Sequence, residues 1–159
     1  MNRANFLKLI ACIALCELAG VIGSVFTFPS IASWYAALNK PFFSPPNFVF
    51  GPVWTALYFL MGVALYLVWV KATDAKLKQP AYTVFALQLF LNVLWSVVFF
   101  GLHSLSGGFA VIILLWLSIA ATIYFFSKIS KKAAWLLSPY LAWVTVASAL
   151  NYAVMALNP

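Results

Sequence analysis

The chain has 159 residues, of which 66% are apolar and 7% are charged, and it carries a formal net charge of +7. This composition, with a mean hydropathy of +1.05, excludes an ordinary water-soluble domain and predicts an integral membrane protein. One histidine, two acidic residues and two cysteines supply too few reactive groups for a hydrolase, a metalloenzyme or a nucleotide-driven pump.

Five continuously apolar runs are each long enough to cross a hydrocarbon core of about 30 Å as a helix. They lie at about 5–27, 52–71, 81–102, 108–127 and 133–156. Because the runs are continuously apolar rather than alternating, they predict helices and not a membrane barrel. The sequence therefore predicts an all-α integral membrane protein, with one membrane domain over 1–159 built as a five-helix bundle.

The first run carries Glu17, Gly20, Ser24 and Thr27 at spacings of three, four and three, which places them on one stripe of a helix. We favour close helix packing through small residues over a ligand contact as the explanation of this stripe. A carboxylate near mid-membrane is costly unless it is neutral or paired. Since no cation of the sequence lies at its depth, our preferred interpretation is a protonated Glu17 that hydrogen-bonds a neighbouring backbone group or hydroxyl. A functional carboxyl is the alternative.

The connector after the first run, 28–51, has a single charged residue, Lys40, among prolines and aromatic rings. A segment of this composition avoids water, so we expect a lid-like loop that closes the mouth of the bundle and is stiffened by its prolines. Pro52 follows it and is expected in the first turn of the second helix, where its missing N–H is harmless.

Three of the later runs each combine aromatic rings with polar groups on one helical face. The faces are Trp54, Tyr58, Met61 and Leu65; Gln88, Asn92, Trp95 and Phe99; and Tyr140, Trp143, Ala147 and Asn151. Amides inside lipid must point at another helix or at a cavity, because an unsatisfied amide in hydrocarbon is costly. A volume lined in this way suits a flat, hydrophobic, conjugated ligand.

The fourth run is plainer. Its Trp116 has no polar neighbour at helical spacing that suggests more than lipid or packing contact, so we interpret this helix as structural. Cys12 and Cys16 lie four residues apart inside the first run and are interpreted as packing residues rather than as a disulfide or metal site.

The basic residues predict the orientation of the chain. All of them except Lys40 flank one side of the predicted bundle: Arg3, Lys8, Lys71, Lys76, Lys78, Lys128, Lys131 and Lys132. The positive-inside rule then places the N-terminus in the cytoplasm and the C-terminus outside, which fits a bacterial inner membrane best. We assign the charges to topology and to contacts with membrane lipid, and we expect no nucleic-acid partner.

Several short motifs occur in a fixed order along the chain. They are Trp34-Tyr35, Leu38, Lys40-Pro41, Pro45-Pro46, Trp54, Leu57-Tyr58, Gln88, Asn92, Trp95, Phe99-Phe100-Gly101, Pro139-Tyr140, Trp143 and Leu150-Asn151-Tyr152. As an ensemble they resemble the translocator protein family, from about Ser24 to Tyr152. Its bacterial members are called tryptophan-rich sensory proteins, and its mammalian member is the peripheral-type benzodiazepine receptor.

The resemblance implies a five-helix bundle, usually a homodimer, that binds porphyrins such as protoporphyrin IX and benzodiazepine-type ligands in a cavity closed by the first loop. It implies no required cofactor, and we expect no catalytic and no metal-binding residue. Taken with the three faces, it gives the expected ligand-binding residues Ser24, Thr27, Trp34, Phe43, Pro45, Pro46, Trp54, Tyr58, Gln88, Asn92, Trp95, Tyr140, Trp143, Ala147, Leu150 and Asn151.

Two positions depart from the family pattern. Phe43 stands where the lid commonly carries Trp, and a phenyl ring is a poorer electron donor than indole, which counts against light-dependent porphyrin degradation but not against binding. No Lys or Arg follows Tyr152, so the sterol motif of mammalian members is incomplete. A membrane receptor or sensor for tetrapyrroles is the leading hypothesis. A porphyrin transporter, a light-dependent porphyrin-degrading enzyme and a purely structural membrane protein are the alternatives.

Overall fold

The computed structural model describes residues 2–71 and 75–159, and these ranges form helices and connecting turns without a strand. The elements are α1 (Arg3–Ile31), α2 (Trp34–Ala37), α3 (Asn47–Lys71), α4 (Ala75–Ser96), the π-helical turn η1 (Val97–Gly101), α5 (Leu105–Ile129), α6 (Lys131–Leu136) and α7 (Ser138–Leu157). Within the described ranges, five stretches are long and apolar enough to cross a membrane. The predicted all-α membrane protein with five spanning helices is confirmed.

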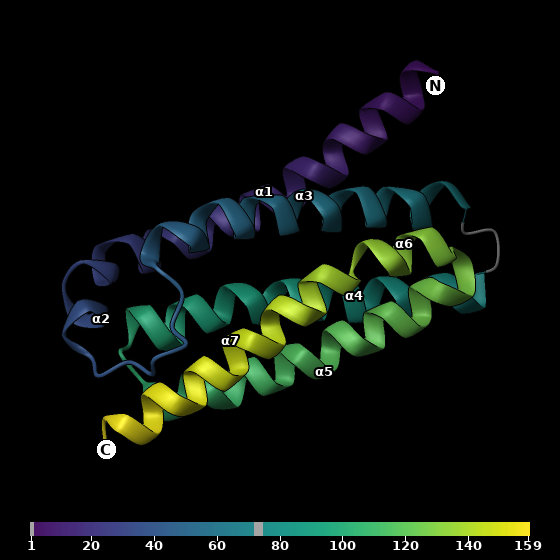
Figure 1. The fold of residues 1–159 in the computed structure, drawn as a ribbon. Helices are drawn as coiled ribbons and strands as arrows, with labels where there is room; N and C mark the ends of the chain where they lie inside the picture. Colours follow the sequence, from purple (N-terminus) through teal and green to yellow (C-terminus); the bar gives the residue numbers. More distant parts are fainter. Residues whose placement is uncertain (1, 72–74) are drawn as a thin grey trace.

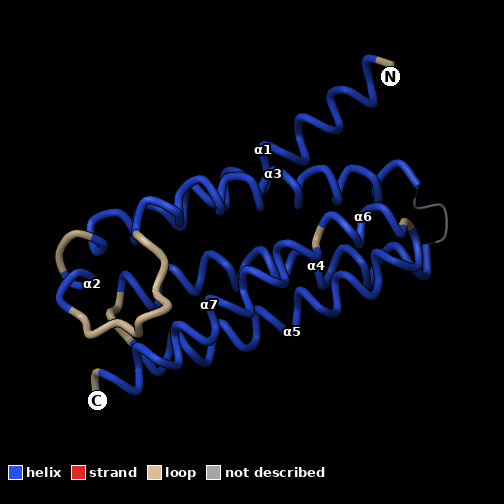
Figure 2. The backbone as a smooth tube through the Cα atoms, in the orientation of Figure 1, coloured by secondary structure: helices blue, strands red, loops and turns tan. Residues whose placement is uncertain are grey.

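The long helices lie side by side in one bundle (Figures 1 and 2). The most extensive packing joins α4 to α5, α1 to α3 and α5 to α7. The short helix α2, the connector around it and the C-terminus lie together at one end of the bundle, whereas the first turns of α1 project away from it at the other (Figure 1).

Two glycines allow α1 and α3 to approach closely. A Cβ atom on Gly62 of α3 would lie 2.5 Å from the Cα atom of Ile13, so the two backbones touch at this point. A Cβ atom on Gly20 of α1 would lie 2.5 Å from the ring of Tyr58. Glycine at a membrane helix crossing permits this approach, because helices in lipid associate through close packing rather than through a hydrophobic driving force.

The helices extend beyond the predicted spans at the connector. Helix α1 continues through Pro29 to Ile31, and α3 begins at Asn47. The prediction that Pro52 lies in the first turn was therefore wrong, because the helix begins just after Pro46 and Pro52 lies inside it. Proline inside a membrane helix is tolerated where neighbouring groups satisfy the freed backbone.

The connector end of the bundle is held by contacts between distant segments. Asn158, the residue after α7, exchanges two hydrogen bonds with the backbone of Asn39: its Oδ1 accepts from the N–H and its Nδ2 donates to the carbonyl, each at 3.0 Å. Ser30 of α1 donates to the Phe100 carbonyl in η1 at 2.8 Å. The Trp34 ring stacks on His103 at 4.5 Å between centroids. These contacts join α2 and the connector to the ends of α1, η1 and α7.

Candidate ligand cavity

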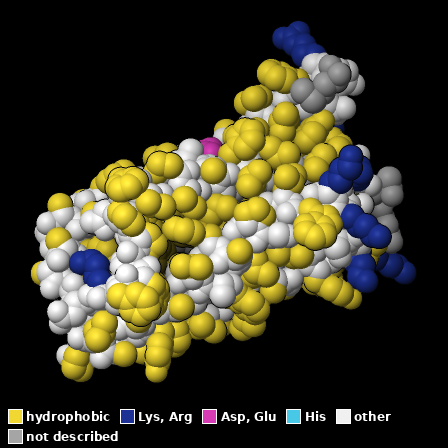
Figure 3. Space-filling view, viewed as in Figure 1, with side chains coloured by type: hydrophobic (Ala, Val, Ile, Leu, Met, Phe, Trp, Pro, Cys, Tyr) yellow, Lys and Arg dark blue, Asp and Glu magenta, His cyan; other side chains and the backbone are white. Residues whose placement is uncertain are grey.

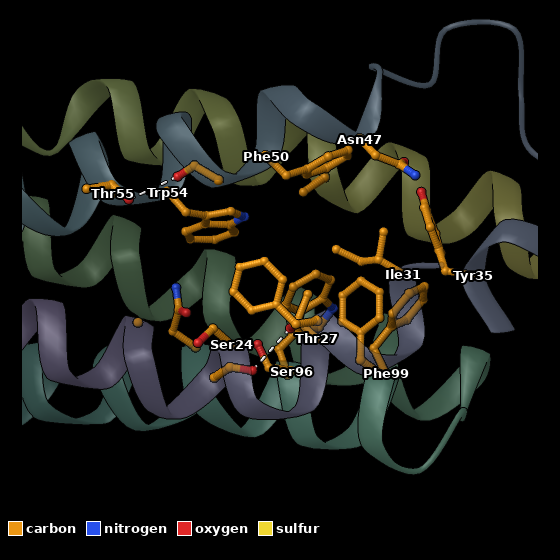
Figure 4. A pocket seen from close by; sticks show the side chains of 18 of the residues that line it. Ser24, Thr27, Ile31, Tyr35, Asn47, Phe50, Trp54, Thr55, Ser96 and Phe99 are labelled. Carbon is orange, nitrogen blue, oxygen red and sulfur yellow. Dashed lines mark hydrogen bonds between the residues drawn. The ribbon is translucent and has the colours of Figure 1, made fainter. Parts of the chain in front are cut away.

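A cavity of about 440 Å³ lies inside the bundle at the end that carries α2. Figure 3 shows the molecule hollowed between apolar side chains, and Figure 4 shows the lining from close by. The lining comes from α1, α2, α3, α4, η1 and α7, and α5 contributes none of the described lining residues. The lining residues are Glu17, Gly20, Val21, Gly23, Ser24, Thr27, Phe28, Ile31, Tyr35, Asn47, Phe48, Phe50, Gly51, Trp54, Thr55, Tyr58, Asn92, Trp95, Ser96, Phe99, Phe100, Trp143, Ala147, Leu150, Asn151 and Val154.

Aromatic rings form much of the wall. Trp54 of α3 and Trp95 of α4 lie with their ring centroids 6.3 Å apart and their planes 30° apart, and Trp95 stacks on Phe99 at 5.5 Å. On the other side, Phe50 meets Trp143 edge-on at 5.8 Å. Such rings give a flat ligand extended π surfaces on which to stack.

A chain of hydrogen bonds links three helices beside the cavity. The Tyr58 hydroxyl donates to Asn92 Oδ1, Asn92 Nδ2 donates to the Tyr140 hydroxyl at 2.7 Å, and that hydroxyl donates to Gln88 Oε1 at 3.0 Å. All four side chains are buried. The chain satisfies groups that would be costly in hydrocarbon, and it fixes the rotamers of Tyr58 and Asn92, which face the cavity.

A second set of hydrogen bonds also joins α4 to α7 beside the cavity. The Trp95 indole N–H donates to Asn151 Oδ1 at 3.1 Å, and Asn151 Nδ2 donates to the Ala147 carbonyl at 2.9 Å. Two buried donors have no hydrogen-bond partner among the described residues, Gln88 Nε2 and Trp143 Nε1. Gln88 lies behind the wall, whereas the Trp143 ring lines the cavity and its unpaired N–H is buried beside it.

The structure brings most of the predicted binding residues to this one cavity. Those that line it are Ser24, Thr27, Trp54, Tyr58, Asn92, Trp95, Trp143, Ala147, Leu150 and Asn151. Gln88 and Tyr140 lie one layer behind, as the support of Asn92.

The predicted lid residues lie elsewhere. Trp34 packs on His103 rather than on the cavity. Phe43 is 42% exposed, and neither it nor Pro45 nor Pro46 lines the cavity. The hydrogen bonds between Asn39 and Asn158 hold this part of the connector at the end of α7, so its rings project outward. Closure of the cavity by the connector stays a prediction.

Sequence reasoning missed several lining residues at the mouth of the cavity. Val21 and Phe28 follow Glu17 and Ser24 at helical spacing on α1, and Gly51 and Thr55 flank Trp54 on α3. Helical spacing from residues on the predicted faces would have found Val21, Phe28 and Gly51. Thr55 directly follows Trp54, and no spacing along the helix singles it out. Outside the cavity, the Trp116 indole donates to Thr145 Oγ1 of α7 at 2.8 Å, a partner that no spacing along its own helix reveals.

The protein family follows from the sequence as a whole. A family model with the description TspO/MBR family matches residues 12–157 of the sequence. The chain belongs to the TspO/MBR family. This confirms the resemblance to translocator proteins on which the binding residues were predicted.

Individual TspO/MBR relatives match over most of their length. The tryptophan-rich protein TspO of Archaeoglobus fulgidus is 46% identical over 156 residues, which cover 97% of this chain and 99% of that protein. The tryptophan-rich sensory protein of Cereibacter sphaeroides is 40% identical over 125 residues, 79% of this chain and 77% of that protein. The human translocator protein is 39% identical over 137 residues, which cover 84% of this chain and 79% of that protein. TspO/MBR membership supports a sensory or receptor role in a membrane.

Proposed function

We propose that the protein is a membrane receptor or sensor that binds tetrapyrroles of the protoporphyrin IX kind, and benzodiazepine-type hydrophobic ligands, in the cavity of about 440 Å³. The observation that carries the proposal is the stacked indole pair Trp54 and Trp95 beside amides whose orientation is fixed by hydrogen bonds. A flat ligand stacks on the rings, and the amides and the free Trp143 N–H orient its polar atoms.

The proposal includes the surroundings of the receptor. We propose that the basic ends of the helices face the cytoplasm of a bacterial cell and contact anionic lipid, with the C-terminus outside. Figure 3 shows Lys and Arg gathered mainly at the end of the bundle away from α2, with one basic patch at the α2 end. We further propose a homodimer. Proteolysis of either end in sealed right-side-out vesicles tests the orientation, and light scattering of detergent-solubilised protein tests the dimer.

Titration of protoporphyrin IX in the dark tests the binding site. We expect the porphyrin to quench the tryptophan fluorescence of the wild-type protein in a saturable way. Combined Trp54→Phe and Trp143→Phe should raise Kd about threefold to tenfold, because indole surface is lost from the wall. Trp116→Phe is the matched control, since Trp116 lies on α5 outside the cavity, and it should leave Kd within about twofold. An equal loss at Trp116 would contradict the assigned cavity.

The same preparation separates the alternatives. A receptor or sensor leaves the porphyrin spectrum unchanged under illumination and moves no porphyrin across a vesicle membrane. A transporter depletes porphyrin from one side of the vesicle. A light-dependent enzyme bleaches the porphyrin in a protein-dependent way.

A further inference from the structure

Exposure along the wall of the cavity is confined to two helices. Of the described residues that line the cavity, every exposed one lies on α1 or α3, and those on α2, α4, η1 and α7 are buried or half-buried. A side chain that lines a cavity and also meets the surroundings of the protein lies at an opening. The exposed lining residues are Val21, Phe28, Asn47, Phe48, Gly51 and Thr55.

The two helices diverge toward the α2 end. Gly62 of α3 touches the backbone of Ile13, and Thr55 and Gly51 precede Gly62 by seven and eleven residues, which places all three on one face of α3. At Gly51, however, a Cβ atom would meet nothing within 4 Å. The face of α3 that touches α1 at Gly62 is therefore separated from it at Gly51, where the cavity reaches the surface.

The opening faces lipid rather than water. Val21 and Thr55 lie inside their helices, ten residues from the end of α1 and eight from the start of α3, which is about 15 and 12 Å along the two axes. Both helices are long and apolar enough to cross a membrane, whose hydrocarbon core is about 30 Å thick. An opening at this depth is bordered by acyl chains.

The other sides of the cavity are closed by packed rings. At the α2 end, Tyr35, Phe99 and Phe100 line the cavity and are buried, and the Tyr35 and Phe99 rings lie 5.7 and 4.9 Å from that of Phe100 between centroids. Between α3 and α7, Phe50 meets Trp143 edge-on. A molecule that enters from water at these places has to separate rings in contact, whereas a molecule in the bilayer meets a gap that already exists.

We propose that ligands reach the cavity sideways from the bilayer, through the opening between α1 and α3, and that the cavity takes flat molecules dissolved in the leaflet at the α2 end. The opening extends to Phe28 and Phe48, in the last turn of α1 and the first turn of α3. An amphiphile such as a porphyrin can keep its carboxylates near the lipid headgroups while its ring enters, so no charge has to cross the hydrocarbon core. This route rests on ligand binding in the cavity, as proposed above.

A thiol inside the cavity tests the route without a receptor ligand. Ser96 of α4 lines the cavity and is buried on the wall opposite Thr55 (Figure 4), so Ser96→Cys places a reactive group behind the opening. Cys12 and Cys16 are buried outside the lining, and the wild-type protein gives their background. In lipid nanodiscs, bilayer-soluble N-(1-pyrenyl)maleimide should label the new thiol, and a membrane-impermeant sulfonated maleimide should not, as read by mass spectrometry. Equally fast labelling by the sulfonated reagent would overturn the proposal.

Two pairs of neighbouring positions show whether the reagent passes between α1 and α3. In the Ser96→Cys background, Thr55→Phe adds a ring at the edge of the opening and should slow labelling about tenfold or more. Ala56→Phe is the matched control, because Ala56 is also exposed but does not line the cavity, and it should change the rate less than about twofold. Val21→Phe, with Ile22→Phe as its control, repeats the test on α1 if Thr55→Phe does not fold. Equal rates within a folded pair would refute the route.

Protoporphyrin IX separates the route from the receptor. Thr55→Phe should lower both its association and its dissociation rate constant, because an obstructed passage slows both directions, whereas the loss of a binding contact raises the dissociation rate. Saturable binding with equal rate constants in Thr55→Phe and Ala56→Phe would refute only the lateral route. Labelling in the expected pattern without saturable binding of protoporphyrin IX would refute only the tetrapyrrole receptor.

Discussion

Asn92 is the residue on which the cavity wall depends most. Its amide accepts from Tyr58 and donates to Tyr140, so it uses both of its ends to join α3, α4 and α7. The side chain is 1% exposed, and its partners are buried with it. Loss of the amide leaves the Tyr58 hydroxyl without its acceptor, and the Tyr140 hydroxyl keeps only its bond to Gln88; removing one partner of a buried hydrogen bond is the costly way to break it.

We therefore expect Asn92→Leu to lower the free energy of unfolding by about 1–3 kcal/mol. Tyr82→Phe on the same helix is the control, because the Tyr82 hydroxyl makes no hydrogen bond to another described side chain. The substitution keeps the ring, whose centroid lies 5.9 Å from Lys78 Nζ. Reversible unfolding in mixed micelles, followed by circular dichroism, measures both. Stability of Asn92→Leu equal to that of the wild type would show that the chain of hydrogen bonds is dispensable.

At the scale of elements, α1 and α3 cross in direct backbone contact, since Gly62 touches the backbone of Ile13. Side chains cannot move aside from a backbone atom, so an added methyl group must separate the helices. Both helices line the cavity toward the α2 end of the bundle, and their crossing supports this part of the cavity wall.

Gly62→Ala is predicted to destabilise the protein by about 1–3 kcal/mol through overpacking. Gly51→Ala on the same helix is the matched control, because a Cβ atom there meets nothing within 4 Å, and alanine is intrinsically the better helix former. Thermal unfolding of the two variants in the same detergent gives the comparison. Equal melting temperatures would mean that α1 and α3 can shift apart without cost.

The stability of the short helix α2 is expected to depend on pH through Tyr35. Burial raises the pKa of Tyr35, and a hydrogen bond with Ser44 partly opposes the shift. A raised pKa means that the folded state holds the phenolic proton more tightly than the unfolded state, so this stability is complete below about pH 10 and is lost as pH rises further. Hydrogen exchange of 34–46 should accelerate above about pH 10 in the wild type, and less in Tyr35→Phe. An identical acceleration in both would exclude Tyr35 as its source.

At the scale of the whole molecule, helical periodicity predicted what lies along a helix and failed for what lies between segments. Trp54, Asn92 and Trp143 line one cavity because each lies on a polar aromatic face that lipid excludes. Phe43 could not be placed in this way, because the path of the connector depends on Asn158, at the far end of the sequence. The Trp116 partner on α7 and the π-helical turn at 97–101 likewise depend on tertiary contacts.

The stacked indoles give the protein an optical reporter of its own. Trp54 and Trp95, with ring centroids 6.3 Å apart and planes 30° apart, are close enough for their excited states to mix. Two coupled chromophores held at a fixed angle in a chiral frame produce a paired positive and negative band at the strong far-ultraviolet indole transition in circular dichroism. Any molecule that enters between the rings, or turns one of them, changes the sign or size of this couplet. Occupancy of the cavity can thus be followed without a label.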